Sequence, residues 1–160
     1  MINSIVHFFS HFHPALATFI MATLPGIERF ALPVAVLGYH LHVWLAMVLA
    51  ILGHMVPITI ILLFADRFHK WISSHSLFGR TWVKALNHAQ KKFASYEKYG
   101  LIGLAIFIAI PLPFNGGYTG AVIAFLLGVP FRKAWPYLFA GVVAATLIIA
   151  ALTVGIDKIF

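Results

Sequence analysis

The segment Pro111-Leu-Pro-Phe-Asn-Gly-Gly-Tyr-Thr-Gly120 separates two apolar runs, Leu101–Ile110 and Ala121–Val129. Each run is shorter than the roughly 20 apolar residues that a helix needs to cross a bilayer. The prolines lack an amide hydrogen and the glycines lack a Cβ, so the segment interrupts a helix and leaves backbone polar groups without intrahelical partners. Hydrocarbon tolerates such groups only where protein buries them or water reaches them. We therefore expect a re-entrant hairpin, whose two half-helices enter and leave on one side and whose polar segment lies near mid-depth.

The composition indicates an integral membrane protein. Of 160 residues, 62% are hydrophobic and 9% are charged, and the mean hydropathy is +0.97. A soluble domain of this size could not bury so much apolar surface, so we expect one membrane domain over residues 1–160. The chain has no cysteine, which excludes disulfides and thiolate metal sites. The net charge of +7 does not indicate a nucleic-acid partner, because the basic residues flank the apolar segments, where they meet membrane lipid.

The first half of the chain repeats the pattern of a short apolar leg and a break. Ala15–Leu24 is a half-length apolar leg, and Pro25-Gly-Ile-Glu-Arg-Phe-Ala-Leu-Pro33 follows it. Within this stretch, Glu28 and Arg29 stand next to each other in uncharged surroundings. We interpret this proline-marked stretch as the break of a first re-entrant hairpin.

An uncharged run then continues as far as Phe64. As a single helix, Ala31–Phe64 would be about 51 Å long, which exceeds a hydrocarbon core of about 30 Å. The run must therefore bend, and Gly38-Tyr-His-Leu-His42 is the segment best suited to a turn. This leaves a short leg, Ala31–Leu37, and a complete span from about Val43 to Phe64.

Asp66–Tyr99 is the one hydrophilic segment of the chain. Apolar and aromatic residues recur on one helical face, namely Trp82, Leu86, Ala89, Phe93 and Tyr96. Basic residues fall on the opposite face, namely Arg80, Lys84, Lys91 and Lys98. This pattern predicts an amphipathic helix that lies on a membrane surface or packs on the protein's own cytoplasmic face.

The second half has the same plan as the first. After the central segment come Pro130-Phe-Arg-Lys133 and a last apolar run, Trp135–Gly155, which is long enough to span. Each half thus has a proline-marked break, a glycine (Gly38 or Gly128) and a span. One span per half inverts the second half relative to the first. We expect an all-α protein of two inverted repeats, residues about 14–64 and 100–155, joined by the amphipathic linker 65–99.

The basic residues predict the orientation. Nine of the eleven lie in segments that this topology puts on one side: Arg67, Lys70, Arg80, Lys84, Lys91, Lys92, Lys98, Arg132 and Lys133. The positive-inside rule then makes the central loop cytoplasmic and puts both termini outside. The alternative is a conventional bundle in which Ile5–Leu24 and Leu101–Gly128 cross the membrane completely, with neighbouring helices satisfying the proline kink.

The two breaks contain the side chains best suited to a substrate or proton pathway. An ionised pair such as Glu28 and Arg29 is costly at mid-depth, so it needs a partner, a water-filled cavity or a function. Asn115, Tyr118 and Thr119 could bind a substrate or an ion together with freed carbonyl groups. The alternatives are that Glu28 and Arg29 lie in the headgroup layer, and that the polar side chains only satisfy the broken backbone.

His54 is the lone ionisable group within the first span, where it could relay protons or hydrogen-bond a neighbouring helix. The candidate pathway residues are Glu28, Arg29, Pro33, His54, Pro111, Pro113, Asn115, Gly116, Tyr118, Thr119 and Gly120. We expect neither a metal nor another cofactor, because no carboxylate stands near the histidines at the N-terminus. An enzyme is not expected, since no two of the four carboxylates form an acid–base pair and no nucleophile or phosphate-binding motif occurs.

Three segments resemble the prokaryotic small multidrug export membrane proteins: Gly53-His-Met-Val-Pro-Ile-Thr-Ile-Ile-Leu-Leu-Phe64, Tyr96-Glu-Lys-Tyr-Gly100 and Ala109-Ile-Pro-Leu-Pro-Phe-Asn-Gly-Gly-Tyr-Thr-Gly-Ala121. The central segment of that family reads roughly P-L-P-G-T-G-A-W-T-G-A. This chain matches it at Pro111, Leu112, Pro113, Gly116, Thr119, Gly120 and Ala121, and departs from it at Phe114, Asn115, Gly117 and Tyr118.

The resemblance extends to the first break, where the family reads E-x-R-G-A-I-P. Arg29, Ala31 and Pro33 fit this pattern, but Glu28 stands one residue closer to the proline. His54 stands where the family is expected to have an asparagine. The family is similar in plan to the DedA-like proteins, which have two re-entrant hairpins and are linked to lipid or proton-coupled transport.

Together, the residues and the resemblance predict a small transporter of the prokaryotic inner membrane, with proton-coupled export of a small or amphipathic substrate between the two hairpins. A DedA-like lipid scramblase or polyprenyl-phosphate translocase is the first alternative. An assembly subunit without transport activity is the second, because small residues in Ala140–Thr153 allow close helix contact, including contact within a homo-oligomer.

Overall fold

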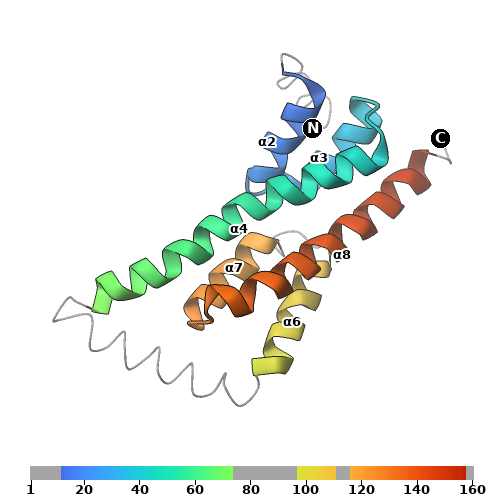
Figure 1. The fold of residues 1–160 in the computed structure, drawn as a ribbon. Helices are drawn as coiled ribbons and strands as arrows, with labels where there is room; N and C mark the ends of the chain where they lie inside the picture. The colour runs from blue at the N-terminus through green and yellow to red at the C-terminus, as the bar shows by residue number, and fades with distance from the viewer. Residues whose placement is uncertain (1–11, 74–96, 111–115, 158–160) are drawn as a thin grey trace.

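A computed structural model describes residues 12–73, 97–110 and 116–157. Every regular element in these ranges is a helix, so the predicted all-α class is confirmed. The elements in chain order are α2 (Pro14–Thr23), α3 (Glu28–Pro33), the π-helix η1 (Val34–Gly38), α4 (Val43–Ser73), α6 (Glu97–Ala109), α7 (Gly117–Leu126) and α8 (Phe131–Asp157) (Figure 1).

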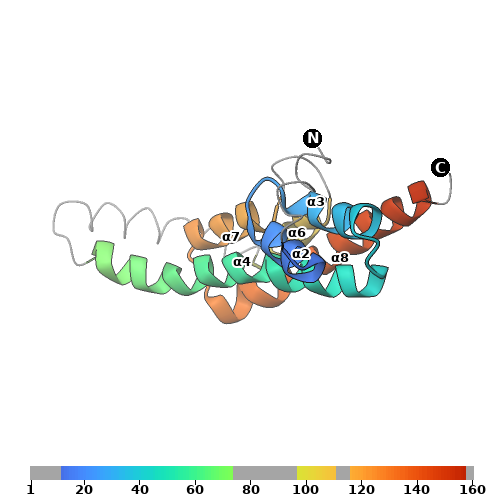
Figure 2. The same cartoon turned by 90° about the horizontal axis from the view of Figure 1, so that it is seen from above.

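The two long helices α4 and α8 run antiparallel and pack against each other (Figures 1 and 2). Their segments Val43–Phe64 and Phe131–Gly155 are long and apolar enough to cross a membrane, as the sequence predicts. Helix α4 does not end at Phe64 but continues to Ser73, into the hydrophilic segment. The predicted amphipathic faces around Trp82–Lys98 fall mainly on residues 74–96, which lie outside the described ranges.

The first break is shorter than the sequence indicates. Helix α2 ends at Thr23, and the chain turns through Gly26, whose φ of +91° favours glycine. Helix α3 already begins at Glu28, so Pro33 lies inside a helix and not in the break. The π-helix η1 follows directly after Pro33 and closes on Tyr39, whose amide donates to the Val34 carbonyl oxygen at 3.0 Å. The wider π-turn accommodates a residue that cannot donate a backbone hydrogen bond.

The predicted turn at Gly38–His42 is present. Helix η1 ends at Gly38, His40 adopts a positive φ of 52°, and α4 begins at Val43. A positive φ outside glycine is uncommon, so this turn is locally strained. The chain reverses here because the uncharged run is too long for one membrane-spanning helix.

Two glycines bring a short helix against each long helix. A Cβ built on Gly53 of α4 would lie 2.6 Å from the carbonyl oxygen of Phe19 in α2. A Cβ built on Gly141 of α8 would lie 2.8 Å from the carbonyl oxygen of Ala105 in α6. Both glycines stand at the same distance along the chain from the first residue of their long helix, Val43 or Phe131. Only glycine permits these close backbone approaches.

The helices of the first half pack in the same pattern as the equivalent helices of the second half. Helix α2 packs on α4 and α6 packs on α8, so each first leg lies on the long helix of its own half. Helices α3 and α7 each contact both long helices. The end of α2 and the start of α7 meet beside the long helices, where Tyr118 contacts Thr23.

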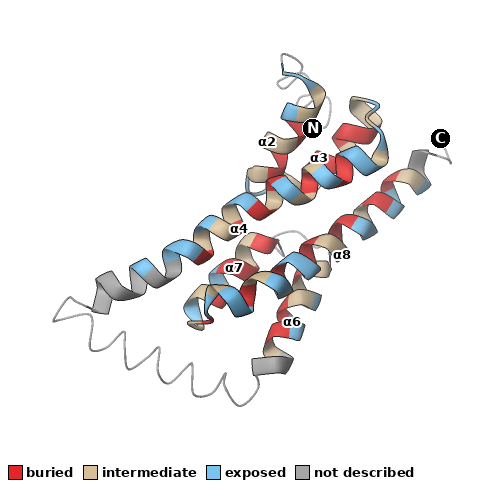
Figure 3. Ribbon diagram, viewed as in Figure 1, coloured by how far each residue is buried: buried red, intermediate tan, exposed pale blue. Residues whose placement is uncertain are grey.

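Among the described residues, the interior holds one large apolar cluster and two small ones (Figure 3). The large cluster joins α4, α6, α7 and α8 and consists of Met55, Ile58, Leu62, Leu101, Leu104, Ile108, Ala121, Ala124, Val129, Ala134, Leu138 and Val142. Large apolar side chains also cover the outside: Trp44, Val48, Leu52, Val56 and Ile60 form an exposed stripe with four-residue spacing on α4. Such a stripe suits lipid contact and not water.

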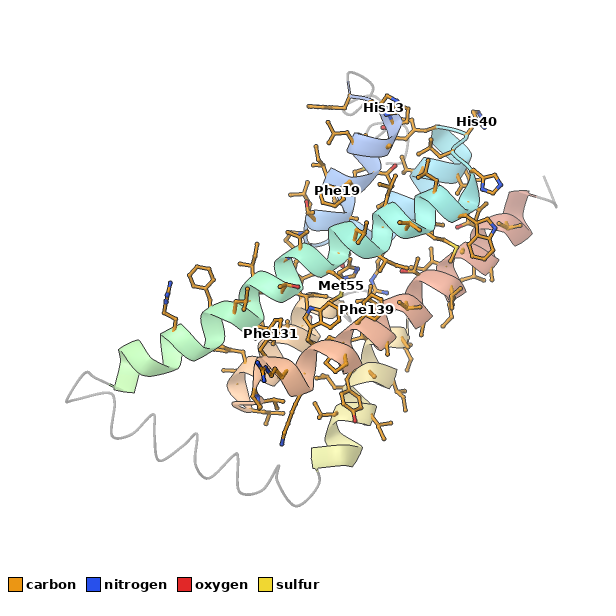
Figure 4. All side chains as sticks on the ribbon, in the orientation of Figure 1. His13, Phe19, His40, Met55, Phe131 and Phe139 are labelled. Carbon is orange, nitrogen blue, oxygen red and sulfur yellow. The ribbon has the colours of Figure 1, made fainter. Side chains whose placement is uncertain are left out.

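Exposed basic residues gather at one end of the long-helix pair. Arg67 lies near the end of α4, and Arg132 and Lys133 lie at the start of α8. We call this the basic end. Figure 4 shows His13 and His40 at the opposite end of the molecule, Phe131 toward the basic end and Met55 between them.

Candidate functional site

A small cavity lies between the two breaks and the long helices. Its volume is about 20 Å³. Its lining residues come from five helices and the second break: Glu28, Arg29, Leu32, Ala50, His54, Ile108, Gly116, Gly117, Ala145, Thr146 and Ile149. It is thus a predominantly apolar cavity into which charged and polar groups of α3, α4 and α8 converge.

A larger pocket of about 520 Å³ adjoins the small cavity. It is lined by Pro25, Gly26, Glu28, Arg29, Phe30, Gly116, Tyr118, Thr119, Ile149 and Leu152. The two cavities share Glu28, Arg29, Gly116 and Ile149. A volume of this size is within the range of ligand pockets, and a mostly apolar wall with a few polar groups is their usual chemistry.

Glu28 and Arg29 owe their position to the first break. The turn at Gly26 starts α3 at Glu28, which puts both residues in the first helical turn and on the walls of both cavities. Glu28 is also the acidic residue in the first turn of α3, where the partial positive charge of a helix N-terminus stabilises a carboxylate. Both side chains are half-buried.

Two consecutive glycines let α7 approach these charged and polar groups. A Cβ built on Gly116 would lie 3.0 Å from Oε1 of Glu28. A Cβ built on Gly117 would lie 3.0 Å from Nε2 of His54 and would collide with Ile58. Gly116 therefore lies against the Glu28 carboxylate and Gly117 against the His54 imidazole, and a larger residue at either position would crowd its neighbour.

Tyr118 connects three parts of the site. Its hydroxyl donates a hydrogen bond of 2.6 Å to the carbonyl oxygen of Thr23, at the end of α2. Its ring stacks on the His54 ring, with centroids 5.5 Å apart and an interplanar angle of 29°. One side chain of the second break thus contacts the first break and the first long helix.

Polar atoms of Glu28 and His54 have no hydrogen-bond partner within the described part of the chain. These atoms are Oε2 of Glu28 and Nε2 of His54, and both are shielded from solvent. Buried polar atoms are rarely left in this state, because desolvation without a hydrogen bond is costly. The site therefore has hydrogen-bonding capacity available for a bound group.

The structure brings together six of the residues that the sequence singles out: Glu28, Arg29, His54, Gly116, Tyr118 and Thr119. Gly120 does not line either cavity, since it packs against Ile108 and Leu138. Pro33 also lies away from them, in the helix that follows Glu28. Pro111, Pro113 and Asn115 lie outside the described residues.

Sequence reasoning missed the contribution of α8. Thr146, Ile149 and Leu152 line the cavities at helical spacing, but nothing distinguishes them within a uniformly apolar span. The sequence marked Gly117 as a helix breaker and as a departure from the family's pattern, whereas the structure shows it packed against Ile58 and His54.

Comparison with known proteins identifies one family. The family described as "Putative small multi-drug export protein" matches residues 28–148, which begin within the first break and include the second break, α4 and most of α8. No curated protein and no solved structure matches the chain.

Proposed function

Because this chain belongs to the small multi-drug export protein family, we propose that it is a proton-coupled transporter of the prokaryotic inner membrane that exports a small or amphipathic substrate. The substrate would bind in the larger pocket. The proton would be carried by groups at the centre of the molecule.

The observation that carries this proposal is that one pocket is lined by both breaks. Glu28 and Arg29 come from the first break, and Gly116, Tyr118 and Thr119 come from the second. Transporters bind their substrates where broken helices of two repeats meet near mid-depth, since freed backbone and charged side chains become available there. Charged side chains inside a membrane domain are costly, which favours a functional role for them.

Glu28 is the best candidate for the proton carrier. The sequence has four carboxylates, and among the side chains that the structure describes Glu28 is the carboxylate that lines both central cavities. Asp66 lies beyond the apolar part of α4, Glu97 is the first residue of α6 and Asp157 is the last residue of α8. A carboxylate that faces both the substrate pocket and the small cavity can exchange a proton according to whether substrate is bound.

The similar helix contacts in the two halves of the chain support an inverted repeat. Such a repeat is the usual basis of alternating access. The helix contacts keep the same pattern when α2, α3 and α4 are replaced by α6, α7 and α8. On α8, the larger pocket contacts Ile149 and Leu152, in the last turns before Gly155. The large apolar cluster occupies the region between the small cavity and the basic end. We propose that this conformation is open away from the basic end, which we assign to the cytoplasm.

A lipid-handling function is the second candidate, favoured by one observation. Leu152 lines the larger pocket and is 59% exposed on the outer face of α8. A pocket that reaches a lipid-facing surface could also accept a lipid headgroup beside Arg29. Scrambling would need no ion gradient, whereas coupled export would.

Reconstitution into liposomes tests the proposal. Proton uptake and the movement of candidate amphiphiles would be measured under a pH gradient, with a fluorescent-lipid bleaching assay on the same preparation. We expect gradient-dependent flux for the wild type and its loss in Glu28→Gln. Asp157→Asn removes the carboxylate at the last residue of α8 and is the matched control. Equal flux in Glu28→Gln and wild type would refute the assignment of Glu28, and gradient-independent lipid bleaching would favour the scramblase.

A further inference from the structure

The small central cavity has the size of a single water molecule. Its volume is about 20 Å³, and a cavity measured in this way needs roughly 10–15 Å³ to hold one water. Leu32, Ala50, Ile108, Ala145 and Ile149 supply apolar walls. An apolar cavity of this kind stays dry unless polar groups hold the water in place.

The cavity does contain such polar groups. Oε2 of Glu28 and Nε2 of His54 are buried without a hydrogen-bond partner in the described ranges, and both residues line the cavity. Thr146 adds a third group: its hydroxyl donates to the Val142 carbonyl oxygen at 2.8 Å, which leaves its lone pairs available. A buried water usually makes about three hydrogen bonds, and these groups can supply them.

Oε2 of Glu28 and Nε2 of His54 do not bond to each other, since both lack a hydrogen-bond partner in the described ranges. Glu28 Oε1 and His54 Nε2 approach the neighbouring residues Gly116 and Gly117, respectively. The two side chains thus lie against consecutive glycines and border the same small cavity. A water molecule can act as donor and acceptor at once, so it can join a carboxylate to either tautomer of an imidazole.

We propose that the small cavity holds one ordered water molecule that bridges Oε2 of Glu28 and Nε2 of His54 and passes protons between them. Protonated Glu28 donates its proton to the water, and the water donates one of its own protons to Nε2 of His54. The products are a Glu28 carboxylate, an imidazolium and an unchanged water. The reverse transfer restores the starting state.

Among the described residues, Arg29 and Tyr118 are the other charged or titratable groups near this water. Arg29 on α3 lines the cavity, and Tyr118 on α7 stacks on His54. The contributions of α6 and α8 are uncharged, namely Ile108, Ala145, Thr146 and Ile149. The positive charge of Arg29 repels an imidazolium at His54, so His54 would hold the proton only transiently.

The water site itself follows from the geometry, whereas its role as a proton relay rests on the proposed function. The two are tested separately by filling the cavity without touching Glu28 or His54. Ala145→Val puts two methyl groups into the cavity from α8. Ala150→Val is the matched control, since Ala150 is equally buried on α8 but lines neither cavity. Ala50→Val fills the cavity from α4 and replaces Ala145→Val if that variant does not fold.

Two measurements on protein in lipid bilayers decide the outcome. Solid-state NMR with ¹⁵N-labelled histidine reports transfer of magnetisation from water to the imidazole, and the signal missing in His54→Asn identifies His54. We expect transfer in the wild type and in Ala150→Val, and its loss in Ala145→Val. In liposomes, Ala145→Val should reduce proton flux to the level of His54→Asn, while Ala150→Val retains it.

Each failure has a distinct meaning. Absence of water contact at His54 in the wild type would overturn the water site. Water contact that is lost in Ala145→Val without a loss of proton flux would overturn the relay. A wild type that moves no protons, yet shows the water contact, would overturn the proposed coupled transport and leave the water site standing.

Discussion

The hydroxyl of Tyr118 donates a hydrogen bond of 2.6 Å to the carbonyl oxygen of Thr23, which is 95 residues away in the chain. Thr23 is the last residue of α2, and Tyr118 is the second residue of α7. A helix that ends at a break leaves carbonyl groups without intrahelical partners. Here a side chain of one break satisfies a carbonyl group of the other, so the two interruptions stabilise each other.

Tyr118→Phe should lower the stability of the protein by about 1 kcal/mol, since it removes this hydrogen bond but retains the ring that stacks on His54. Thermal unfolding in detergent would measure the loss. Tyr137→Phe is the control, because Tyr137 packs on the large apolar cluster and makes no hydrogen bond within the described ranges. An equal loss in both variants would contradict a specific role for the Tyr118–Thr23 contact.

Gly117→Ala should destabilise the protein by roughly 1–3 kcal/mol, because the added methyl group collides with Ile58 and crowds His54. Gly103→Ala is a matched change within a helix, where a Cβ built on the glycine meets no atom within 4 Å. It should be neutral, or stabilising by about 0.5–1 kcal/mol, because alanine is the better helix former. Comparing the two unfolding temperatures tests the close approach of α7 to α4. Similar effects at both positions would argue against that contact.

Gly53→Ala and Gly141→Ala should destabilise the protein to a similar extent, about 1–3 kcal/mol each, because each pushes a short helix away from its long helix. Gly155→Ala, where a Cβ meets nothing within 4 Å, is the control. Chemical unfolding in detergent micelles would give the three values. A large cost at only one of the two glycines would weaken the equivalence of the halves.

Single cysteines test the topology without interference, since the native chain has none. His42 precedes α4 and Pro130 precedes α8, so these two exposed residues lie at opposite ends of the antiparallel pair. With the basic end in the cytoplasm, an impermeant maleimide applied to intact cells should label His42→Cys and spare Pro130→Cys. Labelling of lysed cells controls for reactivity. Modification of Pro130→Cys from outside would place the basic end in the exterior and exclude the proposed orientation.

The amino-acid sequence was sufficient to predict the long helices and the places where the chain turns. Val43–Phe64 and the last apolar run are long and apolar enough to cross a membrane, and a bilayer core sets that length. The same length limit predicted the turn at Gly38–His42. Glu28 and Arg29 stood out because charge is rare and costly in such a chain.

Tertiary packing decided which of the singled-out residues meet. Gly120 and Gly116 look alike in sequence, but Gly120 packs against Ile108 and Leu138 while Gly116 faces Glu28. Pro33 marked a break in sequence, but a π-helix accommodates it within continuous helical structure. Local pattern cannot distinguish these outcomes, because they depend on what the neighbouring helix presents.

The set of residues that line the cavities likewise depends on the tertiary structure. Thr146, Ile149 and Leu152 of α8 line them only because α8 packs across α3 and α7. Apolar periodicity identifies a span and says nothing about which of its faces will border a cavity. The sequence by itself determined the membrane-spanning helices and the costly charged pair, since these follow from hydrophobicity and length. Which side chains surround that pair was decided by close packing between helices far apart in the chain.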